Sequence, residues 1–196
     1  MSWTAIVPVK CGEGVKSRLA GRLSAKVRAE LVAWMARRII DRLGRTPGID
    51  QILIASEAKD LAPGNRLPIQ YTGAGKGLNE DLEQARMAAG GGSYLIVLGD
   101  LPLLETGDIL ALLHAAEGAG AAIAPDRHGT GTNALAIADN RPFPLVFGPD
   151  SFEKHLAATG RDTAIVRRPG LAFDIDTPDD LDCVLKLFPV MNSPAF

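Results

Sequence analysis

The sequence has few cysteines, no excess of positive charge and no apolar run long enough to cross a membrane. Its two cysteines, Cys11 and Cys183, stand outside any Cys-x-x-Cys or Cys/His array, which argues against a zinc site. Two isolated thiols suit a reducing compartment. The first residues lack the basic segment and long apolar stretch of a secretory leader. We therefore expect a cytoplasmic protein with no membrane partner.

The charge balance is mildly acidic, with a net charge of -2 and a pI of about 5.9. No basic stripe interleaved with aromatic residues is present, so a nucleic-acid partner is not expected. Local basic clusters can still bind a small anionic metabolite. Hydrophobic residues make up 46% of the 196 residues, which is enough for one packed domain. We expect a single domain over 1–188 and a loosely attached tail over 189–196.

Short apolar runs alternate with longer amphipathic stretches along the chain, which is typical of an α/β fold. The pattern predicts strands at Thr4–Val9, Gln51–Ala55, Pro68–Tyr71, Tyr94–Leu98, Ala121–Ala124, Ala134–Ala138, Ala164–Arg167 and Leu171–Phe173. It predicts helices at Ala25–Leu43, Asn79–Ala89, Gly107–Ala116 after a Thr106 cap, Phe152–Thr159 and Pro178–Leu187. The runs Ile52–Ile54 and Leu95–Leu98 are apolar on both faces, which indicates parallel strands covered by helices on both sides. Such sheets bind ligands at the carboxyl ends of their strands.

A basic, glycine-containing segment follows the first predicted strand. Gly12 and Gly14 permit tight backbone turns, and Lys10, Lys16 and Arg18 are suited to a polyphosphate. The spacing fits neither a Walker A loop nor a Gly-x-Gly-x-x-Gly fingerprint. A solvated basic loop therefore remains an alternative to phosphate binding.

Three aspartates stand where a divalent cation could be held. Asp100 directly follows the strongest predicted strand, and Asp174 and Asp176 are two residues apart, so on extended backbone they point to the same side. Carboxylates together with phosphate oxygens are the ligands that magnesium prefers. The alternatives are a turn aspartate for Asp100 and helix N-terminal charge for Asp176. We expect one or two Mg²⁺ ions at this cluster.

Two further loops carry groups that suit an anion. The segment 125–133 contains two glycines, two threonines and a basic pair between two strands, and it can present backbone N–H groups and hydroxyls. The segment 147–151 opens a short helix, whose N-terminus can bind phosphate. Simple helix capping is the alternative role for Ser151.

These motifs resemble one family when they are taken in order. The matching stretches are Val-Pro-Val-Lys with Lys-Ser-Arg-Leu, Gly-Leu-Asn, Gly-Asp-Leu-Pro-Leu-Leu, Ala-Pro-Asp-Arg-His-Gly-Thr-Gly-Thr-Asn-Ala-Leu, Phe-Gly-Pro-Asp-Ser-Phe-Glu-Lys-His and Asp-Ile-Asp-Thr-Pro-Asp-Asp-Leu. Together they resemble the 2-phospho-L-lactate guanylyltransferase family, including its phosphoenolpyruvate and 3-phosphoglycerate branches. The resemblance covers roughly residues 5 to 185.

The resemblance implies a Rossmann-like, GT-A-type nucleotidyltransferase domain with a mostly parallel mixed sheet. It also implies transfer of GMP from GTP to a small phosphorylated carboxylic acid, with release of pyrophosphate, in coenzyme F420 biosynthesis. Carried over by motif, three aspartates hold magnesium, a first group contacts the acid substrate and a second group lies near the nucleotide. The magnesium set is Asp100, Asp174 and Asp176; the acid set is Lys10, Thr132, Gly148 and Ser151; the nucleotide set is Lys16, Arg18 and Asn79.

Other interpretations stay open at this point. One is a guanylyltransferase for another acceptor, such as the molybdenum cofactor or a sugar phosphate. Another is a non-catalytic protein that binds GTP and releases no pyrophosphate. The sequence also leaves open a homodimer, a hand-off of the product to the next pathway enzyme, and the choice among the acids.

Overall fold

A seven-stranded mixed sheet forms the centre of the computed structural model, which describes residues 1–12, 14–62, 64–73, 75–139, 141, 143–159 and 162–188. The predicted tail over 189–196 lies outside the described residues. The strands are β1 (Trp3–Pro8), β2 (Ile49–Ala55), β3 (Ile69–Thr72), β4 (Ser93–Val97), β5 (Ala121–Pro125), β6 (Thr132–Ile137) and β7 (Thr163–Ile165). The helices are η1 (Ser17–Leu19), α1 (Ala25–Gly44), α2 (Leu78–Ala88), α3 (Thr106–Ala119), α4 (Ser151–Thr159), α5 (Pro169–Ala172) and α6 (Pro178–Leu187).

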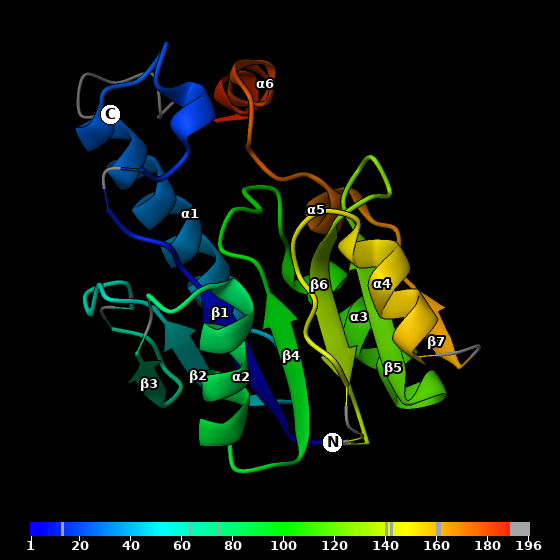
Figure 1. Ribbon diagram of the computed structural model, residues 1–196. Coiled ribbons are helices and arrows are strands. Elements are labelled where there is room, and N and C mark those ends of the chain that lie inside the picture. Colours follow the sequence, from blue (N-terminus) through cyan, green and yellow to red (C-terminus); the bar gives the residue numbers. More distant parts are fainter. Residues whose placement is uncertain are drawn as a thin grey trace.

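The strand order is β3-β2-β1-β4-β6-β5-β7. Strand β6 pairs antiparallel with both β4 and β5, whereas the other pairs are parallel. The carboxyl ends of β2, β1 and β4 therefore lie at one edge of the sheet, beside the beginning of β6 (Figure 1). The predicted α/β fold with a mostly parallel mixed sheet is confirmed.

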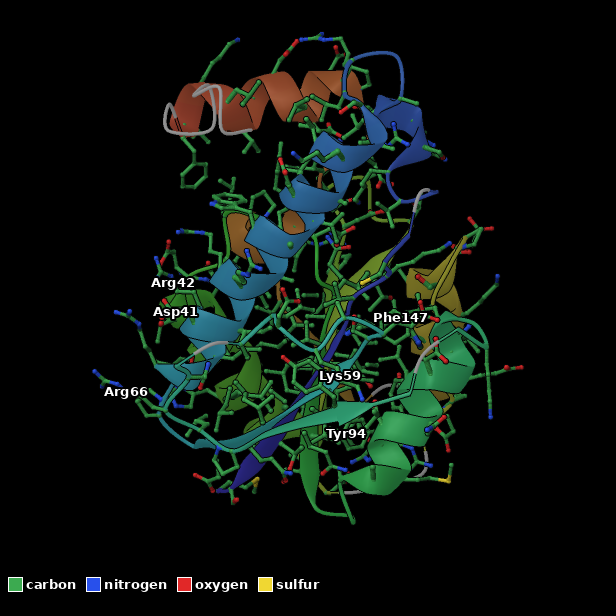
Figure 2. All side chains as sticks on the ribbon, turned by 90° about the vertical axis from the view of Figure 1, so that its left-hand side faces the viewer. Asp41, Arg42, Lys59, Arg66, Tyr94 and Phe147 are labelled. Carbon is green, nitrogen blue, oxygen red and sulfur yellow. The ribbon has the colours of Figure 1, made fainter. Side chains whose placement is uncertain are left out.

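Helices cover both faces of this sheet. Helices α1 and α3 pack on one face together with alternate strand residues such as Ala5 and Val7. Helices α2 and α4 pack on the other face together with the intervening strand residues, including Ile6. Figure 2 shows the sheet between α1 and α2. Covering both faces leaves the strand ends as the edge where polar side chains gather.

A third cluster joins α6 to the beginning of α1. It contains Leu19, Leu31, Met35, Ile175, Leu181 and Val184, all buried. Helix α6 lies across the beginning of α1 (Figure 2). Ile175 is fully buried between the two aspartates that flank it in the sequence, so its packing anchors the segment that carries them.

The predicted strand at Leu171–Phe173 is wrong, because residues Pro169–Ala172 form the short helix α5. Proline is favoured in the first turn of a helix. The side-chain amide of Asn133 donates to the backbone carbonyl oxygens of Leu171 (3.1 Å) and Ala172 (3.3 Å). The Asn133 amide thus supplies the hydrogen-bond donors that a neighbouring strand would otherwise provide to these carbonyl groups.

The predicted Thr106 cap is also one residue late. Helix α3 begins at Thr106 and its N-cap is Glu105, whose backbone N–H donates to the carboxylate of Asp108 over 3.1 Å. This capping-box contact extends the helix by one residue at its start. None of the described helices is both long enough and apolar enough to span a bilayer.

Candidate active site

Asp100 is placed at the end of β4 by a close approach between two strands. A side chain on the preceding residue, Gly99, would put its Cβ 2.8 Å from the carbonyl oxygen of Pro8 and 3.3 Å from Val9. Glycine therefore lets the ends of β1 and β4 approach, because it has no Cβ. The backbone carbonyl of Asp100 in turn accepts a hydrogen bond from the N–H of Ile175 (3.3 Å).

The segment carrying Asp174 and Asp176 is fixed by the capping box of α6. The carboxylate of Asp180 accepts hydrogen bonds from the backbone N–H groups of Asp176 (2.9 Å) and Thr177 (2.7 Å). Arg127, from the loop between β5 and β6, pairs with the same carboxylate and donates to the carbonyl oxygen of Asp174 over 3.4 Å. Burial alone would raise the pKa of Asp180, but the hydrogen bonds from Asp176, Thr177 and Arg127 outweigh it and lower the pKa.

The three predicted aspartates come together. One carboxylate oxygen from each of Asp100, Asp174 and Asp176 lies within 4.8 Å of the others. The Oδ1 atom of Asp100 is buried and has no hydrogen-bond partner among the described residues. A buried acceptor without a partner is costly unless a cation or water meets it. The oxygen ligands and the unpaired atom therefore fit a hard divalent cation such as Mg²⁺.

Lys16 lies at the centre of this cluster. Its Nζ donates to the carboxylates of Asp100 (2.7 Å) and Asp176 (2.8 Å), and Arg18 approaches Asp176 at 3.5 Å. The backbone of Lys16 is left-handed, with φ 47 and ψ 46. A lysine seldom adopts this conformation, which costs energy and tends to occur at functional sites.

Charge shifts two pKa values within the cluster. Burial lowers the pKa of Lys16, but the two neighbouring carboxylates outweigh it and the net pKa is raised. Burial raises the pKa of Asp174, as do the negative charges of Asp100 and Asp176, and Lys16 opposes this only in part. Both shifts reflect a site with more negative than positive charge, which is suited to an additional cation.

A cavity of about 720 Å³ opens beside these residues. Its lining includes the predicted side chains of Lys10, Lys16, Arg18, Asp100 and Asp176. The cavity extends from β4 past the ends of β1 and β2 to the residues that begin α2. This volume is in the range of small-molecule sites.

Thr132, Ser151 and His155 form a separate, buried network. The backbone N–H of Thr132 donates to the Ser151 hydroxyl oxygen (2.9 Å), and the N–H of Val146 donates to Nε2 of His155 (3.2 Å). A neutral ring that accepts at Nε2 carries its hydrogen on Nδ1, so Nδ1 donates to the Thr132 hydroxyl oxygen, 2.9 Å away. Burial lowers the pKa of His155 to about 4, which is consistent with that neutral ring.

Asn79 and Gly148 lie at the turn that leads into α4, which begins at Ser151. The side chain of Asn79 donates to the carbonyl oxygen of Phe147 (3.0 Å) and accepts from its backbone N–H (2.8 Å). Gly148 follows with φ 123, and a Cβ built there would meet nothing within 4 Å. Asn79 thus holds the turn that leads into α4 at Ser151.

The register of the sheet brings this network close to the acidic cluster. Val97 of β4 is paired with Ala134 of β6, and the N–H of Leu98 donates to the carbonyl oxygen of Asn133 (3.0 Å). This contact joins the residue after Thr132 to the residue two positions before Asp100. The predicted residues therefore form two neighbouring groups along one sheet edge.

Several contacts in the site were not anticipated from the sequence. Arg127 and Asp180 form an ion pair, and Asp180 also belongs to the capping box of α6. His155 is fully buried and bonded to Thr132. Glu57 lines the cavity, and no motif points to it. Each depends on contacts between segments far apart in the chain, which a single sequence does not reveal.

Solved structures share this architecture. A candidate nucleotide-diphospho-sugar transferase from Desulfovibrio desulfuricans matches with a TM-score of 0.75 and 19% identity, covering 95% of this chain and 88% of its own. A nucleotidyl transferase from Methanothermobacter thermautotrophicus matches with a TM-score of 0.65 and 18% identity, covering 97% and 99%. The fold is therefore that of the nucleotidyltransferases.

Comparison of sequences defines the class more narrowly. Residues 3–186 match the family described as "Guanylyl transferase CofC like", and the chain belongs to this family of guanylyltransferases. A phosphoenolpyruvate guanylyltransferase from Rubrobacter xylanophilus is 42% identical over 190 residues, covering 92% of each chain. The enzyme of the same name from Sphaerobacter thermophilus is 37% identical over 190 residues, covering 93% of this chain and 92% of its own. The resemblance to a guanylyltransferase family that the sequence motifs indicated is confirmed. Membership of this family favours an enzyme over a non-catalytic GTP-binding protein.

Proposed function

We propose that this enzyme transfers GMP from GTP to the phosphate of a small phosphorylated carboxylic acid, with phosphoenolpyruvate as the first candidate. The observation that carries the proposal is the meeting of Asp100, Asp174 and Asp176 beside Lys16, at a cavity that Asp100, Asp176 and Lys16 line. The relatives named phosphoenolpyruvate guanylyltransferase support this acid over 2-phospho-L-lactate and 3-phosphoglycerate. The step belongs to coenzyme F420 biosynthesis and takes place in the cytoplasm.

The three aspartates are proposed to hold Mg²⁺. When it is bound, the ion supplies charge neutralisation for the triphosphate and for the leaving pyrophosphate. Lys16 and Arg18 are assigned to the phosphates of GTP, since both lie in the cavity next to the carboxylates. Lys10, which also lines the cavity, is assigned to the acid substrate.

The acid is assigned to the neighbouring group of Thr132, Gly148 and Ser151. The hydroxyl oxygens of Thr132 and Ser151 accept from His155 and from the Thr132 backbone, respectively, which leaves both hydroxyl hydrogens available to an anion. The open turn at Gly148 leads to the N-terminus of α4, where the helix dipole favours negative charge. Asn79 is placed near the nucleotide by its motif, and its bonds to Phe147 support an indirect role through this turn.

The chemistry is an in-line displacement at phosphorus. An oxygen of the acid's phosphate forms a bond to the α-phosphorus of GTP, while the bond between that phosphorus and the bridging oxygen breaks and pyrophosphate leaves with the electron pair. A phosphate nucleophile is already ionised near neutral pH, so no general base is needed. Orientation of the two substrates can contribute about 7–11 kcal/mol in favourable cases, and preorganised charge contributes further.

The test is release of pyrophosphate from GTP with each of the three acids in turn. We expect release with at least one acid, greatest with phosphoenolpyruvate, together with a guanylylated acid seen by phosphorus NMR. The next enzyme of the pathway can be added to consume an unstable product. Absence of pyrophosphate with all three acids, at GTP and Mg²⁺ concentrations that saturate binding, would refute the proposal.

A further inference from the structure

The cavity has a second end that the assigned phosphate and metal groups leave unused. It is formed by residues after β2 and before α2, including Glu57, Gly75, Gly77 and Leu78. Ala55 of β2 pairs with Pro8 of β1, and β1 in turn pairs with β4, which leads to Asp100. The two ends of the cavity are therefore separated by two strand spacings, about 10 Å. This separation is comparable with the length of a nucleoside.

Four carboxylates line the described part of the cavity, and three of them already have partners. Asp100 and Asp176 pair with Lys16. Asp81 accepts hydrogen bonds from the backbone N–H groups of Gly75 (3.0 Å) and Lys76 (3.2 Å). No hydrogen bond or ion pair to the carboxylate of Glu57 is formed by the described residues. Glu57 is thus the lining carboxylate that remains available for a ligand.

Glu57 is held in place at its backbone, and its carboxylate lies beside Gly75, which has no side chain. The hydroxyl of Ser56 accepts a hydrogen bond from the N–H of Ala58 (3.2 Å), which fixes the turn around Glu57. A Cβ on Gly75, whose φ is 110, would lie 3.2 Å from Oε1 of Glu57. Because glycine has no side chain, the carboxylate of Glu57 can lie close to the Gly75 backbone.

We propose that Glu57 selects guanine by accepting hydrogen bonds from its N1–H and N2–H groups, an inference that rests on the proposed use of GTP. A carboxylate is an acceptor only, so it complements two adjacent donors on guanine. Adenine presents an unprotonated N1 at the same place, which a carboxylate repels. A site that hydrogen-bonds a substrate group strongly rejects the analogue that lacks it.

The experiment compares wild type, Glu57→Gln and the control Glu80→Gln, which removes an exposed carboxylate on the neighbouring helix outside the cavity lining. We measure kcat/KM for pyrophosphate release with GTP, ITP and ATP, using phosphoenolpyruvate as acceptor. Glu57→Gln is expected to lower the value for GTP by about 10- to 100-fold, as for loss of a charge-assisted hydrogen bond. The value of kcat/KM for ITP, which lacks the N2 amino group, is expected to fall less than the value for GTP. The preference for GTP over ATP is expected to fall by at least about tenfold, because the amide of glutamine can pair with adenine.

The control variant should keep the wild-type preference. Equal losses for GTP, ITP and ATP in Glu57→Gln, or an unchanged preference, would overturn the proposal. Calorimetric binding of GTP and ATP to the same three proteins in Mg²⁺ decides base selection without turnover. If wild type binds GTP in preference to ATP but releases no pyrophosphate, the proposed function fails while the assignment of Glu57 is still tested by the binding constants.

Discussion

Lys16 and Asp100, 84 residues apart in the sequence, are joined by an ion pair of 2.7 Å at the carboxyl edge of the sheet. The same ammonium group also contacts Asp176. Lys16 therefore stands among the carboxylates proposed to hold Mg²⁺, in a strained backbone conformation. The positive charge of this one side chain offsets part of the repulsion that three adjacent aspartates would otherwise experience.

Replacing Lys16 with methionine should destabilise the protein in the absence of metal. The change leaves Asp100 and Asp176 without their cation, and because Asp176 is partly exposed we expect a loss of about 1–3 kcal/mol, less than for a fully buried pair. Mg²⁺ should then raise the melting temperature of Lys16→Met more than that of wild type. Thermal unfolding with Mg²⁺ and with EDTA measures both effects.

The matched control is Lys26→Met, which removes an exposed lysine from a 3.9 Å pair with Glu30. It should unfold like wild type under both conditions. A Lys16→Met variant whose melting temperature does not respond to Mg²⁺ would speak against a cation site at the aspartates.

Replacing Asp100 with asparagine should abolish transfer while the fold is kept. The change removes one charge and one metal-binding oxygen from the cluster, and loss of such transition-state stabilisation costs roughly a thousandfold in kcat. Circular dichroism and the melting temperature should stay close to wild type, because loss of the ion pair with Lys16 is offset by weaker repulsion among the aspartates and Lys16 keeps its contact with Asp176. Asp60→Asn, a change at an exposed aspartate, is the control. Turnover close to wild type in Asp100→Asn would discredit the metal assignment.

Replacing Ser151 with alanine should weaken use of the acid more than use of GTP. The hydroxyl accepts from the Thr132 backbone and has its own hydrogen free for an anion, so its loss removes about 1–2 kcal/mol of binding, or about 5- to 30-fold in KM for the acid. Steady-state kinetics with each substrate varied separately give the two Michaelis constants. Equal effects on both constants would argue against this role and favour simple support of the α4 turn.

The sequence predicted the placement of the aspartates because that placement follows from local geometry. Asp100 comes directly after an apolar strand, and Asp174 and Asp176 are spaced so that Ile175 can pack inward between them. Both features are encoded within a few residues. The chemical roles of these side chains remain predictions that the kinetic experiments test.

The contacts that were missed join distant segments. Helix α5 forms where a strand was expected, because the Asn133 side chain supplies hydrogen bonds to carbonyl groups of this segment. The segment also packs closely against its neighbours at Gly170, which leaves no room for a side chain. A Cβ on Gly170 would meet the carboxylate of Asp108 and the carbonyl oxygen of Leu103 at 2.8 Å or less. The apolar pattern of three residues cannot distinguish a strand from a buried helical turn, so tertiary contacts decide between them.

Replacing Arg127 with lysine should loosen the segment that carries Asp174. The guanidinium contacts both the Asp180 carboxylate and the carbonyl oxygen of Asp174, and it lies over the ring of Phe173 at 4.9 Å. A lysine keeps the charge but cannot reproduce these contacts together. We expect a loss of about 1–3 kcal/mol in stability and a lower affinity for Mg²⁺.

Manganese binding followed by electron paramagnetic resonance, together with urea unfolding, checks both effects of Arg127→Lys. The control is Arg141→Lys, at a partly exposed arginine far in the sequence from the three clustered aspartates, whose ion pair is with Asp139. Unchanged manganese affinity in Arg127→Lys would show that the metal site does not depend on this arginine.

His155 should make the protein less stable as the pH falls from about 6.5 to about 4. Burial lowers the pKa of its ring to about 4 in the folded protein, whereas an unfolded chain has the ordinary value of about 6.5. Between these values the unfolded chain binds the proton and the folded protein does not. The free energy of unfolding therefore decreases with decreasing pH, by at most about 1.4 kcal/mol per pH unit for this group.

His155→Gln removes this proton-linked effect while keeping a polar side chain opposite Thr132. Urea unfolding at several pH values between 7.5 and 4.5 should give a shallower decline for the variant than for wild type. At pH 7.5 the variant itself should be less stable by about 1–3 kcal/mol, because the buried contacts to Thr132 and Val146 are imperfectly replaced. His114→Gln, at an exposed histidine of α3, should keep the wild-type slope. Identical slopes for wild type and His155→Gln would mean that the buried ring does not take up its proton on unfolding in this range.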